Sequence, residues 1–292
     1  MMVHSTKTNL EFREMKILVE SGATKSDWRI LDEAGVQKGR ILKAGMNVST
    51  VRMSFIKDTL SEAISQTGLK RLDGFYLYTA GIITSAIREE LTSHIHALIK
   101  VDDIDIEDDL MGAARSLYGH SEGIVAIMGT GSNTCLYDGE RVFRKVMSGG
   151  YVLGDHGSAA TLGKLFLSAF LKNEISEKVA EEFASRFDSS YAAIVENVYR
   201  SPAPSRYLGS LAPFIVSHYD DPCIKEMVDS NFQSFIDLSL KKYDTTHLPV
   251  GVVGGFGYAC RDIFLPLAEK AGIDVNRIVA EPVSGLLEYH CA

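Results

Sequence analysis

Three apolar segments of this sequence run directly into turns of small residues, and this feature constrains the fold most. The turns cover residues 20–25 (ESGATK), 129–133 (GTGSN) and 254–257 (GGFG). A turn rich in Gly, Ser and Thr exposes backbone N–H groups and hydroxyls that can surround phosphate oxygens. One such turn alone is typical of an ordinary hairpin. Three at strand ends, with carboxylates beside them, favour an α/β protein that binds phosphate groups.

The common nucleotide-binding fingerprints do not match these turns. Residues 22–26 (GATKS) lack the spacing of a Walker-type loop, and a strand rather than a helix follows them. Residues 255–260 (GFGYAC) lack the third glycine of the dinucleotide fingerprint and come late in the chain. A phosphate-binding β-hairpin is a different kind of site, and it needs two hairpins that face each other across a cleft.

The apolar periodicity predicts a strand-rich start and a helical later part. Strands are expected over 16–20, 26–32, 36–43, 73–79 and 98–101, with helices over 51–66, 84–97 and 108–117. A similar pattern restarts with strands over 123–128, 134–137 and 141–146, followed by a helical stretch over 158–243 that is broken at 201–204 and near 221–222. The last expected elements are a strand over 250–253, a helix over 260–271, a strand over 277–280 and a helix after Pro282. The recurring strand–turn–strand unit is a weak internal repeat, which indicates two α/β domains.

The two repeats place the domain boundary near 112–119. We expect an N-terminal domain over 15–112 and a C-terminal domain over 113–292, enlarged by the helical insertion at about 158–243. Residues 1–14 are polar and aperiodic, and Met15 directly precedes the first strand. They are either a non-functional extension before a natural start at Met15 or a short frayed tail.

Composition excludes several classes of protein. The 292 residues are 46% hydrophobic and carry a formal charge of −8, without clusters of Lys or Arg. This balance argues against nucleic acid or an anionic membrane as the main partner. No apolar run approaches the roughly 18–20 residues that cross a bilayer. The four cysteines are far apart in the sequence, which favours reduced thiols in a cytoplasmic protein.

Three carboxylates and one tryptophan stand out beside the glycine turns. Asp109 is expected to start a helix, where it is either an N-cap or a catalytic base. Asp155 lies in a glycine-rich loop, and Glu20 ends a buried strand, where a carboxylate is costly without a partner. The acidic run 102–109 is expected to be mostly a solvated connection, and Trp28 is expected in the core.

Together these motifs resemble the sugar-kinase branch of the actin/hexokinase/heat-shock ATPase superfamily. More closely, the chain is similar to the N-acetylglucosamine kinase group of the BadF/BadG/BcrA/BcrD ATPase family. The resemblance covers about 15–290 and rests on residues 20–28 (ESGATKSDW), 45–47 (GMN), 109–113 (DLMGA), 129–133 (GTGSN), 149–158 (GGYVLGDHGS) and 253–258 (VGGFGY). It implies two actin-like (ribonuclease H-like) domains with an ATP and sugar cleft between them.

The resemblance also implies roles for individual residues. Asp109 would accept the proton of the sugar hydroxyl, and Glu20 would assist Mg²⁺ through water. Backbone and side chains of the three turns would bind ATP through Gly22, Ala23, Thr24, Lys25, Gly129, Gly131, Ser132, Gly254 and Gly255. The sugar pocket would comprise Asn47, Thr79, Thr130, Asn133, Gly150 and Asp155.

Three positions depart from the family pattern. Tyr151 replaces the usual Trp in a glycine-rich loop about two residues shorter than usual, His156 replaces the usual Glu, and Val48 stands where Pro is common. The changes in the loop leave the identity of the sugar open. Kinase chemistry does not depend on them.

The leading hypothesis is an ATP- and Mg²⁺-dependent kinase of a hexose or amino sugar, with N-acetylglucosamine and its 6-hydroxyl as first candidates. One alternative is an activase-type ATPase that acts on a partner protein, as relatives with paired cluster-binding cysteines do. A second is a sugar and ATP sensor without catalysis. Related kinases are often dimers, and the stretch 158–243 offers surface for a homodimer.

Overall fold

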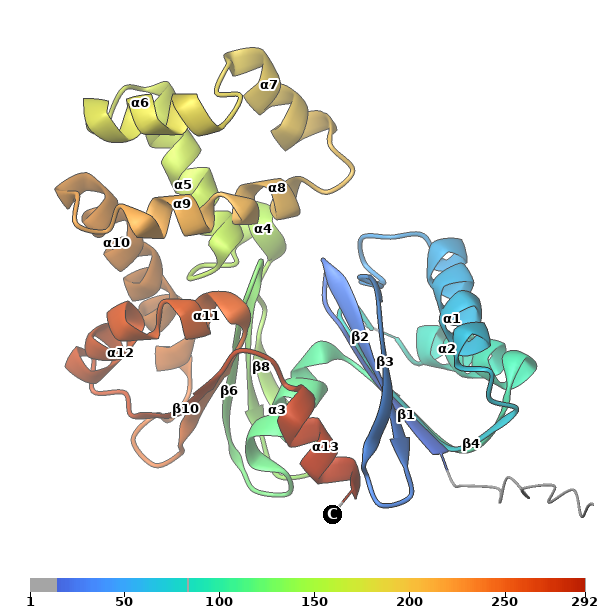
Figure 1. Cartoon of the computed structure of the whole chain (residues 1–292). Coiled ribbons are helices and arrows are strands. Elements are labelled where there is room, and N and C mark those ends of the chain that lie inside the picture. Colours follow the sequence, from blue (N-terminus) through green and yellow to red (C-terminus); the bar gives the residue numbers. More distant parts are fainter. Residues whose placement is uncertain (1–14, 83, 292) are drawn as a thin grey trace, which may run out of the picture. The chain divides into compact units, whose positions relative to one another are not determined.

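The chain folds into two compact α/β units, as the alternating pattern of its sequence predicts. The computed structural model describes residues 15–82 and 84–291 (Figure 1). Of the described residues, those over 15–109 and 290–291 form the first unit, and residues 110–289 form the second. Each unit contains one five-stranded sheet, so the expected fold class is confirmed. The proposed extension over 1–14 lies outside the described residues, and the domain limits drawn from the sequence stay predictions.

The first unit is built on a sheet with the strand order β3-β2-β1-β4-β5. Strands β1, β2 and β3 are antiparallel neighbours, whereas β4 and β5 run parallel to β1. The strands are β1 Met15–Ser21, β2 Lys25–Asp32, β3 Gln37–Ala44, β4 Arg71–Thr79 and β5 Lys100–Glu107, and the helices are α1 Met53–Thr67 and α2 Ser85–Leu98.

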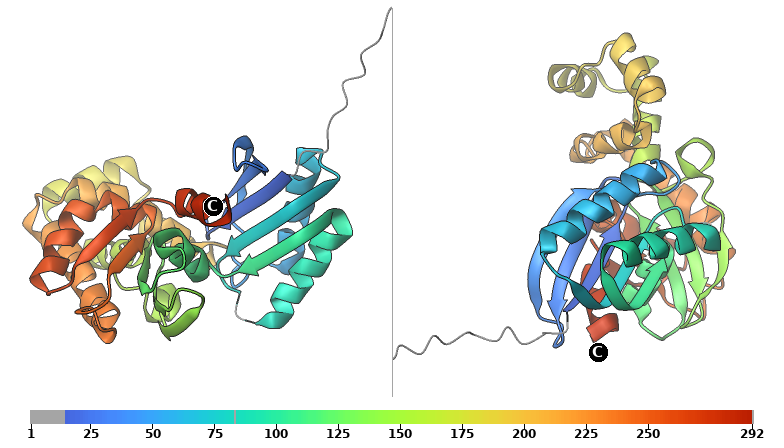
Figure 2. Two further views of the ribbon diagram at one scale, coloured as in Figure 1. Left: turned by 90° about the horizontal axis from the view of Figure 1, so that it is seen from below. Right: turned by 90° about the vertical axis from the view of Figure 1, so that its right-hand side faces the viewer.

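Helices α1 and α2 cover one face of this sheet (Figures 1 and 2). Alternation along β1 directs Ile17 and Val19 to this face, where both are fully buried. Trp28 on β2 is also fully buried, which confirms its expected place in the core, and its Nε1 donates to Ser26 Oγ. Burial of apolar side chains of this size contributes about 1.5–3 kcal/mol each.

Strand β5 corrects one expectation from the sequence. The strand was expected to end at residue 101 and the acidic run to be a solvated connection, but β5 continues to Glu107. Val101 and Ile106 are buried against the core, while Asp102 and Asp103 remain exposed at the edge of the sheet. Acidic side chains therefore coexist with a strand because an edge strand can keep them in water.

The second unit has a sheet with the order β10-β9-β6-β7-β8. Strand β6 lies parallel to β9 and antiparallel to β7. The strands are β6 Gly123–Met128, β7 Ser132–Tyr137, β8 Val142–Val146, β9 Val250–Val253 and β10 Val275–Val279. The helices are α3 Asp109–Tyr118, α4 Gly150–Leu153, α5 Ala159–Leu171, α6 Glu177–Arg186, α7 Tyr191–Val195, α8 Pro204–Ser210, α9 Ala212–Ser217, α10 Pro222–Leu238, α11 Gly255–Ala259, α12 Arg261–Lys270 and α13 Val283–Cys291, with a π-helical turn over Glu196–Arg200 and a 3-10 turn over Leu240–Lys242.

One continuous apolar core joins this sheet to helices α5–α12. Phe166 from α5, Phe232 and Phe235 from α10, and Phe264 from α12 are all fully buried. Pro204 and Pro222 each lie at the start of a helix, α8 and α10, where the missing N–H costs nothing. The breaks expected at 201–204 and 221–222 are thereby confirmed.

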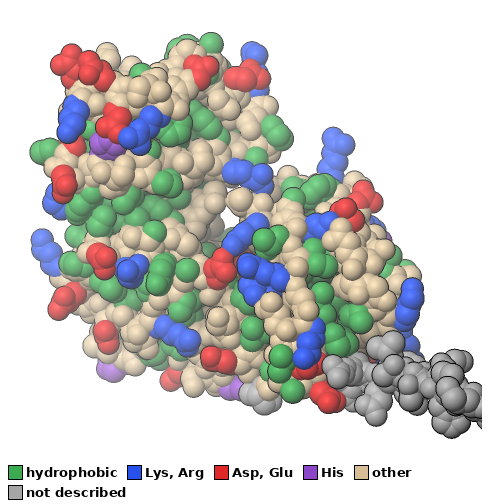
Figure 3. Space-filling model, in the orientation of Figure 1, with side chains coloured by type: hydrophobic (Ala, Val, Ile, Leu, Met, Phe, Trp, Pro, Cys, Tyr) green, Lys and Arg blue, Asp and Glu red, His purple; other side chains and the backbone are tan. Residues whose placement is uncertain are grey.

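The surface of the chain mixes charges of both signs. On the face shown in Figure 3, Lys and Arg are interspersed with Asp and Glu over both units. Among residues 15–82 and 84–291, no helix is long and apolar enough to span a membrane.

Candidate functional site

The first glycine turn joins β1 to β2 in the first unit. The N–H of Gly22 donates to the carbonyl of Lys25 at 3.1 Å, which closes the hairpin. Glu20 lies directly opposite Asp27 across the two strands. The sequence therefore placed the turn correctly, between a buried strand and an antiparallel partner.

A second segment, residues 45–47, packs directly on this turn. The N–H of Gly45 donates to the carbonyl of Thr24 at 3.2 Å, and a Cβ on Gly45 would lie 2.3 Å from the carbonyl oxygen of Gly22. Only glycine permits this close approach of two backbones. Asn47 therefore ends a segment that packs on the first turn, and its place in a sugar pocket stays a prediction.

Buried hydroxyls hold this segment from both sides. Ser21 Oγ accepts a hydrogen bond from the N–H of Met46 at 2.8 Å, and Thr79 Oγ1 donates to the carbonyl of Met46 at 2.9 Å. Both side chains are fully buried. Thr79 therefore positions the backbone beside Asn47, and Ser21, which sequence reasoning missed, does the same. A polar residue at the end of a buried strand was the available signal for Ser21.

Glu20 is the residue of this unit to which the resemblance assigns magnesium. Its neighbour Asp27 is 1% exposed and accepts hydrogen bonds from Arg29 and Arg40, so its oxygens are already occupied. Burial raises the pKa of Asp27, but the hydrogen bonds and charges of Arg40 and Arg29 lower it by more. Within the described residues no cluster of three or more His, Cys, Asp or Glu could hold a metal. One carboxylate fits a Mg²⁺ that keeps most of its waters and binds phosphates, rather than a cage of protein ligands.

The second glycine turn, residues 129–131, joins β6 to β7 in the second unit. The N–H of Gly129 donates to the carbonyl of Gly131 at 2.9 Å. The carbonyls of Gly129 and Thr130 accept from Ala159 and Ala160 at 3.0 Å, at the start of α5. The turn is therefore fixed to the N-terminus of a thirteen-residue helix. Helix N–H groups without a partner in their own helix supply this attachment.

Asp155 lies against this turn. A Cβ on Gly131 would lie 2.8 Å from Asp155 Oδ2, so only glycine leaves room for the carboxyl. Burial raises the pKa of Asp155 to about 6, although hydrogen bonds from the Ser132 N–H and the Ser148 hydroxyl and the charge of Lys164 oppose this shift. The residue is 8% exposed and has a φ of 52°. A non-glycine residue in this left-handed region costs about 1–2 kcal/mol, and such strain is often found at functional sites.

A cavity of about 160 Å³ opens beside Asp155 within the second unit. Its lining is mostly polar and comes from four separate segments: Ser132, Asn133, Thr134, Val146, Met147, Ser148, Leu153, Gly154, Asp155, His156, Leu238 and Ser239. Asn133 and Asp155 thus line the same cavity, whereas Thr130 and Gly150 do not, and the sugar-binding roles of all four stay predictions. Ser148, Leu238 and Ser239 were missed, because no local pattern shows that distant segments meet.

The third glycine turn follows β9. Gly254 has a φ of 137°, and a Cβ there would lie 2.3 Å from the carbonyl oxygen of Met128, the last residue of β6. The second and third turns therefore lie at the same edge of the sheet, because β6 and β9 are parallel neighbours. A Cβ on Gly255 would meet no atom within 4 Å, so this position faces open space.

Asp109 is the first residue of α3 and is half-buried. Its carboxylate lies in the first turn, where the helix dipole favours a negative charge. This placement agrees with the helix start expected from the sequence. The role of Asp109 as the base of a reaction stays a prediction.

Known proteins show the same architecture. A candidate N-acetylglucosamine kinase from Porphyromonas gingivalis is 35% identical, covers 95% of this chain and 99% of its own, and superposes with a TM-score of 0.90. A second candidate N-acetylglucosamine kinase, from Chromobacterium violaceum, is 19% identical, with coverages of 95% and 99% and a TM-score of 0.73. A ROK family glucokinase from Streptomyces griseus, solved with glucose and AMPPNP, shares the fold at 15% identity, coverages of 94% and 97% and a TM-score of 0.55.

Comparison of the sequence with protein-family models identifies the family of the chain. No curated protein matches the chain. The sequence model of the BadF/BadG/BcrA/BcrD ATPase family matches residues 19–220, which include the first two glycine turns and Asp155. This match covers more than half of the chain and agrees with the 35% identical structure. The chain therefore belongs to the BadF/BadG/BcrA/BcrD ATPase family.

Proposed function

We propose that this protein is an ATP- and Mg²⁺-dependent sugar kinase, with N-acetylglucosamine as its first candidate substrate and the 6-hydroxyl as the acceptor. The observation that carries the proposal is the buried Asp155 carboxyl beside the Gly131 turn, at the wall of a polar cavity. A carboxyl held in this way can accept hydrogen bonds from sugar hydroxyls. The 35% identity to a candidate N-acetylglucosamine kinase supports the choice of sugar.

The glycine turns would bind the nucleotide. In the first unit, the Gly22 N–H closes the hairpin on the Lys25 carbonyl, so the backbone of Ala23 and Thr24 and the Lys25 side chain would contact phosphate oxygens. In the second unit, residues 129–132 would do the same, and Gly254 and Gly255 would pack beside the adenosine. Bound Mg²⁺, held through water by Glu20, would neutralise charge on the phosphates.

Asp109 would act as the base of the reaction. A carboxylate in hydrogen-bond reach of the sugar hydroxyl can accept its proton as the hydroxyl attacks the γ-phosphate. We expect Asp109→Asn to abolish turnover, while sugar binding changes by less than about tenfold, because an amide accepts no proton. Stopped-time ADP assays and calorimetric sugar titration measure the two effects.

A matched control separates this role from a general charge effect. Asp102→Asn makes the same change at an exposed position of β5, where the side chain pairs with Arg71, and should leave turnover unchanged. Persistent turnover in Asp109→Asn would exclude Asp109 as the base. Loss of sugar binding together with turnover would make it a binding residue instead.

A coupled ADP-release assay tests the proposed activity directly. The panel consists of N-acetylglucosamine, N-acetylmuramic acid, glucosamine, N-acetylmannosamine and glucose, each with Mg²⁺ and ATP. Sugar-stimulated ADP release supports the kinase, and the preferred sugar identifies the substrate. Sugar-independent hydrolysis would favour an activase-type ATPase, and sugar binding without ADP release would favour a sensor. Phosphorus NMR of the product then identifies the phosphorylated hydroxyl.

A further inference from the structure

A buried asparagine on α10 contacts the loop that carries Asp155. Asn231 is 2% exposed, and the other buried residues of α10 are Ile224, Val228, Phe232, Phe235 and Ile236, all apolar. A buried amide among apolar side chains costs free energy unless its donor and acceptor are both satisfied. Its place in an otherwise apolar helix face therefore calls for specific partners.

Asn231 finds both partners on two adjacent backbone residues. Its Oδ1 accepts a hydrogen bond from the N–H of Gly157 at 2.9 Å, and its Nδ2 donates to the carbonyl of Ser158 at 3.2 Å. These partners lie 74 and 73 residues earlier in the chain. One side chain thus holds the loop at two points.

Helix α10 also packs against the loop next to these hydrogen bonds. Gly157 has a φ of 75°, and a Cβ there would lie 2.5 Å from the Cβ of Phe235, one helical turn after Asn231. The loop therefore sits directly on α10, with a glycine where the two surfaces meet. Asn231 hydrogen-bonds the backbone of Gly157 and Ser158, and the side chain of Phe235 limits how closely Gly157 can approach the helix.

The backbone of Asp155 is held by the same set of interactions. Its N–H donates to the carbonyl of Ser148, and its carbonyl accepts from the N–H of Ser158 at 3.1 Å and from Thr161 Oγ1 at 2.8 Å. Ser158, one of the two residues bound by Asn231, is thus also bonded to Asp155. The left-handed backbone at Asp155 persists because these contacts determine it from several sides.

We propose that Asn231 is a positioning residue, which holds the Asp155 carboxyl in the cavity by fixing the backbone of Gly157 and Ser158. This role rests on the proposed function for its effect on sugar, but its effect on Asp155 does not. Loss of both hydrogen bonds frees residues 157–158 and lets the strained backbone at Asp155 relax. The Asp155 carboxyl then loses its hydrogen bond from the Ser132 N–H and becomes exposed to water.

The ligand-free protein provides the first readout. In Asn231→Leu, which has similar size but no polar atoms, we expect the Asp155 pKa to fall by about one unit from about 6, because the carboxyl becomes hydrated. Carbon-13 NMR of the side-chain carboxyl measures this pKa. Lys164 of α5 is the charged group acting on Asp155, and it is unchanged in the variant. Near-ultraviolet circular dichroism confirms that the variant is folded.

Kinetics provide the second readout. The sugar KM of Asn231→Leu should rise by about tenfold or more, with the ATP KM changed by less than about threefold, because a small displacement of a binding group is costly. Asn231→Asp retains the acceptor for the Gly157 N–H and should show intermediate effects. If Asn231→Leu does not fold, the Asp155 pKa and the sugar KM are measured on Asn231→Asp instead. Asn197→Leu is the matched control. The Asn197 Nδ2 donates to the carbonyl of Ala193 and not to the loop that carries Asp155, so both readouts should stay as in wild type.

Two outcomes overturn the proposal. The first is a folded Asn231→Leu protein with an unchanged Asp155 pKa. The second is a lowered pKa together with an unchanged sugar KM in an active enzyme. If wild-type protein shows no sugar-dependent ADP release, the proposed function fails, whereas the pKa comparison still decides whether Asn231 positions Asp155.

Discussion

Asp155 shows how a single buried carboxyl can lower the stability of the fold. Its pKa is raised from 3.8 to about 6 by burial, so the folded protein binds a proton more tightly than the unfolded chain does. Ionisation of this carboxyl therefore destabilises the fold as the pH rises through 6. Below pH 3.8 the carboxyl is protonated in both the folded and the unfolded state, so it has no such effect there. Proteins often accept this kind of cost at binding sites.

We expect Asp155→Asn to stabilise the folded state at pH 8 by up to about 3 kcal/mol, since about two pKa units are involved. The gain should vanish near pH 4, where the wild-type carboxyl is protonated in the folded state. Urea unfolding at the two pH values measures the difference. A gain of equal size at both pH values would contradict the pKa explanation. Sugar affinity should fall in the same variant, because a neutral amide binds hydroxyl donors less strongly.

Sequence reasoning identified some site residues and missed others for a physical reason. Asp155 and Asn133, which line the cavity, lie within recognisable glycine-rich motifs: the glycine-rich loop pointed to Asp155, and the family resemblance pointed to Asn133. Asn231 and Ser239 reach the same region only because α10 packs on the loop. Nothing near them in the sequence indicates that contact. Long-range packing, rather than local chemistry, places them.

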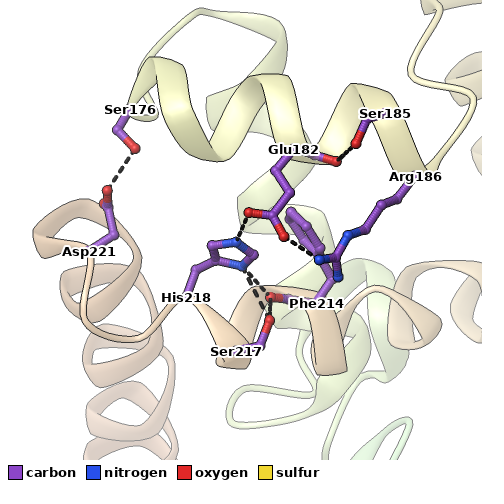
Figure 4. A network of polar contacts seen from close by, with 8 residues as sticks. All are labelled: Ser176, Glu182, Ser185, Arg186, Phe214, Ser217, His218 and Asp221. Atoms are coloured by element: carbon purple, nitrogen blue, oxygen red, sulfur yellow. Dashed lines mark hydrogen bonds and ion pairs between the residues drawn. The ribbon is translucent and has the colours of Figure 1, made fainter.

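At the scale of elements, α6 and α9 are joined by a polar network (Figure 4). His218 Nε2 contacts Glu182 Oε2 at 3.0 Å, and His218 Nδ1 contacts the carbonyl of Phe214 at 2.8 Å. Arg186 also pairs with Glu182, and Ser176 donates to Asp221 at 2.6 Å. Burial lowers the pKa of His218, but the hydrogen bonds to Glu182 and Phe214 raise it by more. The contact therefore favours the protonated imidazole.

This pKa predicts how the helical insertion responds to pH. The stabilisation from His218 is complete below its unfolded pKa of 6.5 and is lost as the pH rises through the higher folded value. We expect His218→Gln to lower the melting temperature by about 1–3 °C at pH 6 and by less at pH 9. The charged groups that face His218 are Glu182, Arg186 and Asp221. His247→Gln removes an exposed His–Asp pair and should show no such difference between the two pH values.

The elements themselves were largely predictable, and the exceptions have clear causes. Proline marked the starts of α8 and α10, and glycine turns marked the ends of β1, β6 and β9. The acidic residues of β5 are more typical of a solvated connection than of a strand, so the sequence pattern predicts too short a strand there. Its pairing with β4 and the burial of Ile106 outweigh the local preference of the acidic residues.

At the scale of the whole molecule, the first unit is made from two separate parts of the chain. Helix α13 begins in the second unit, but its last residues belong to the first. There the ring of His290 stacks on Tyr76 with centroids 3.7 Å apart, and its Nε2 lies 2.7 Å from the hydroxyl of Tyr78. Lys16 Nζ also donates to the carbonyl of His290 at 3.2 Å. The end of α13 therefore contacts both β1 and β4.

We expect His290→Ala to destabilise the first unit by about 1–2 kcal/mol, because an aromatic contact and a partly buried hydrogen bond are lost together. Hydrogen exchange should become faster in β1 and β4, while amides of β6 and β9 keep their wild-type rates. His96→Ala, an exposed histidine on α2 of the same unit, is the matched control and should leave all four strands unchanged. Equal acceleration in β6 and β9 would show that His290 supports the folding of the whole chain. Unchanged exchange in β1 and β4 would show that the first unit is stable without the end of α13.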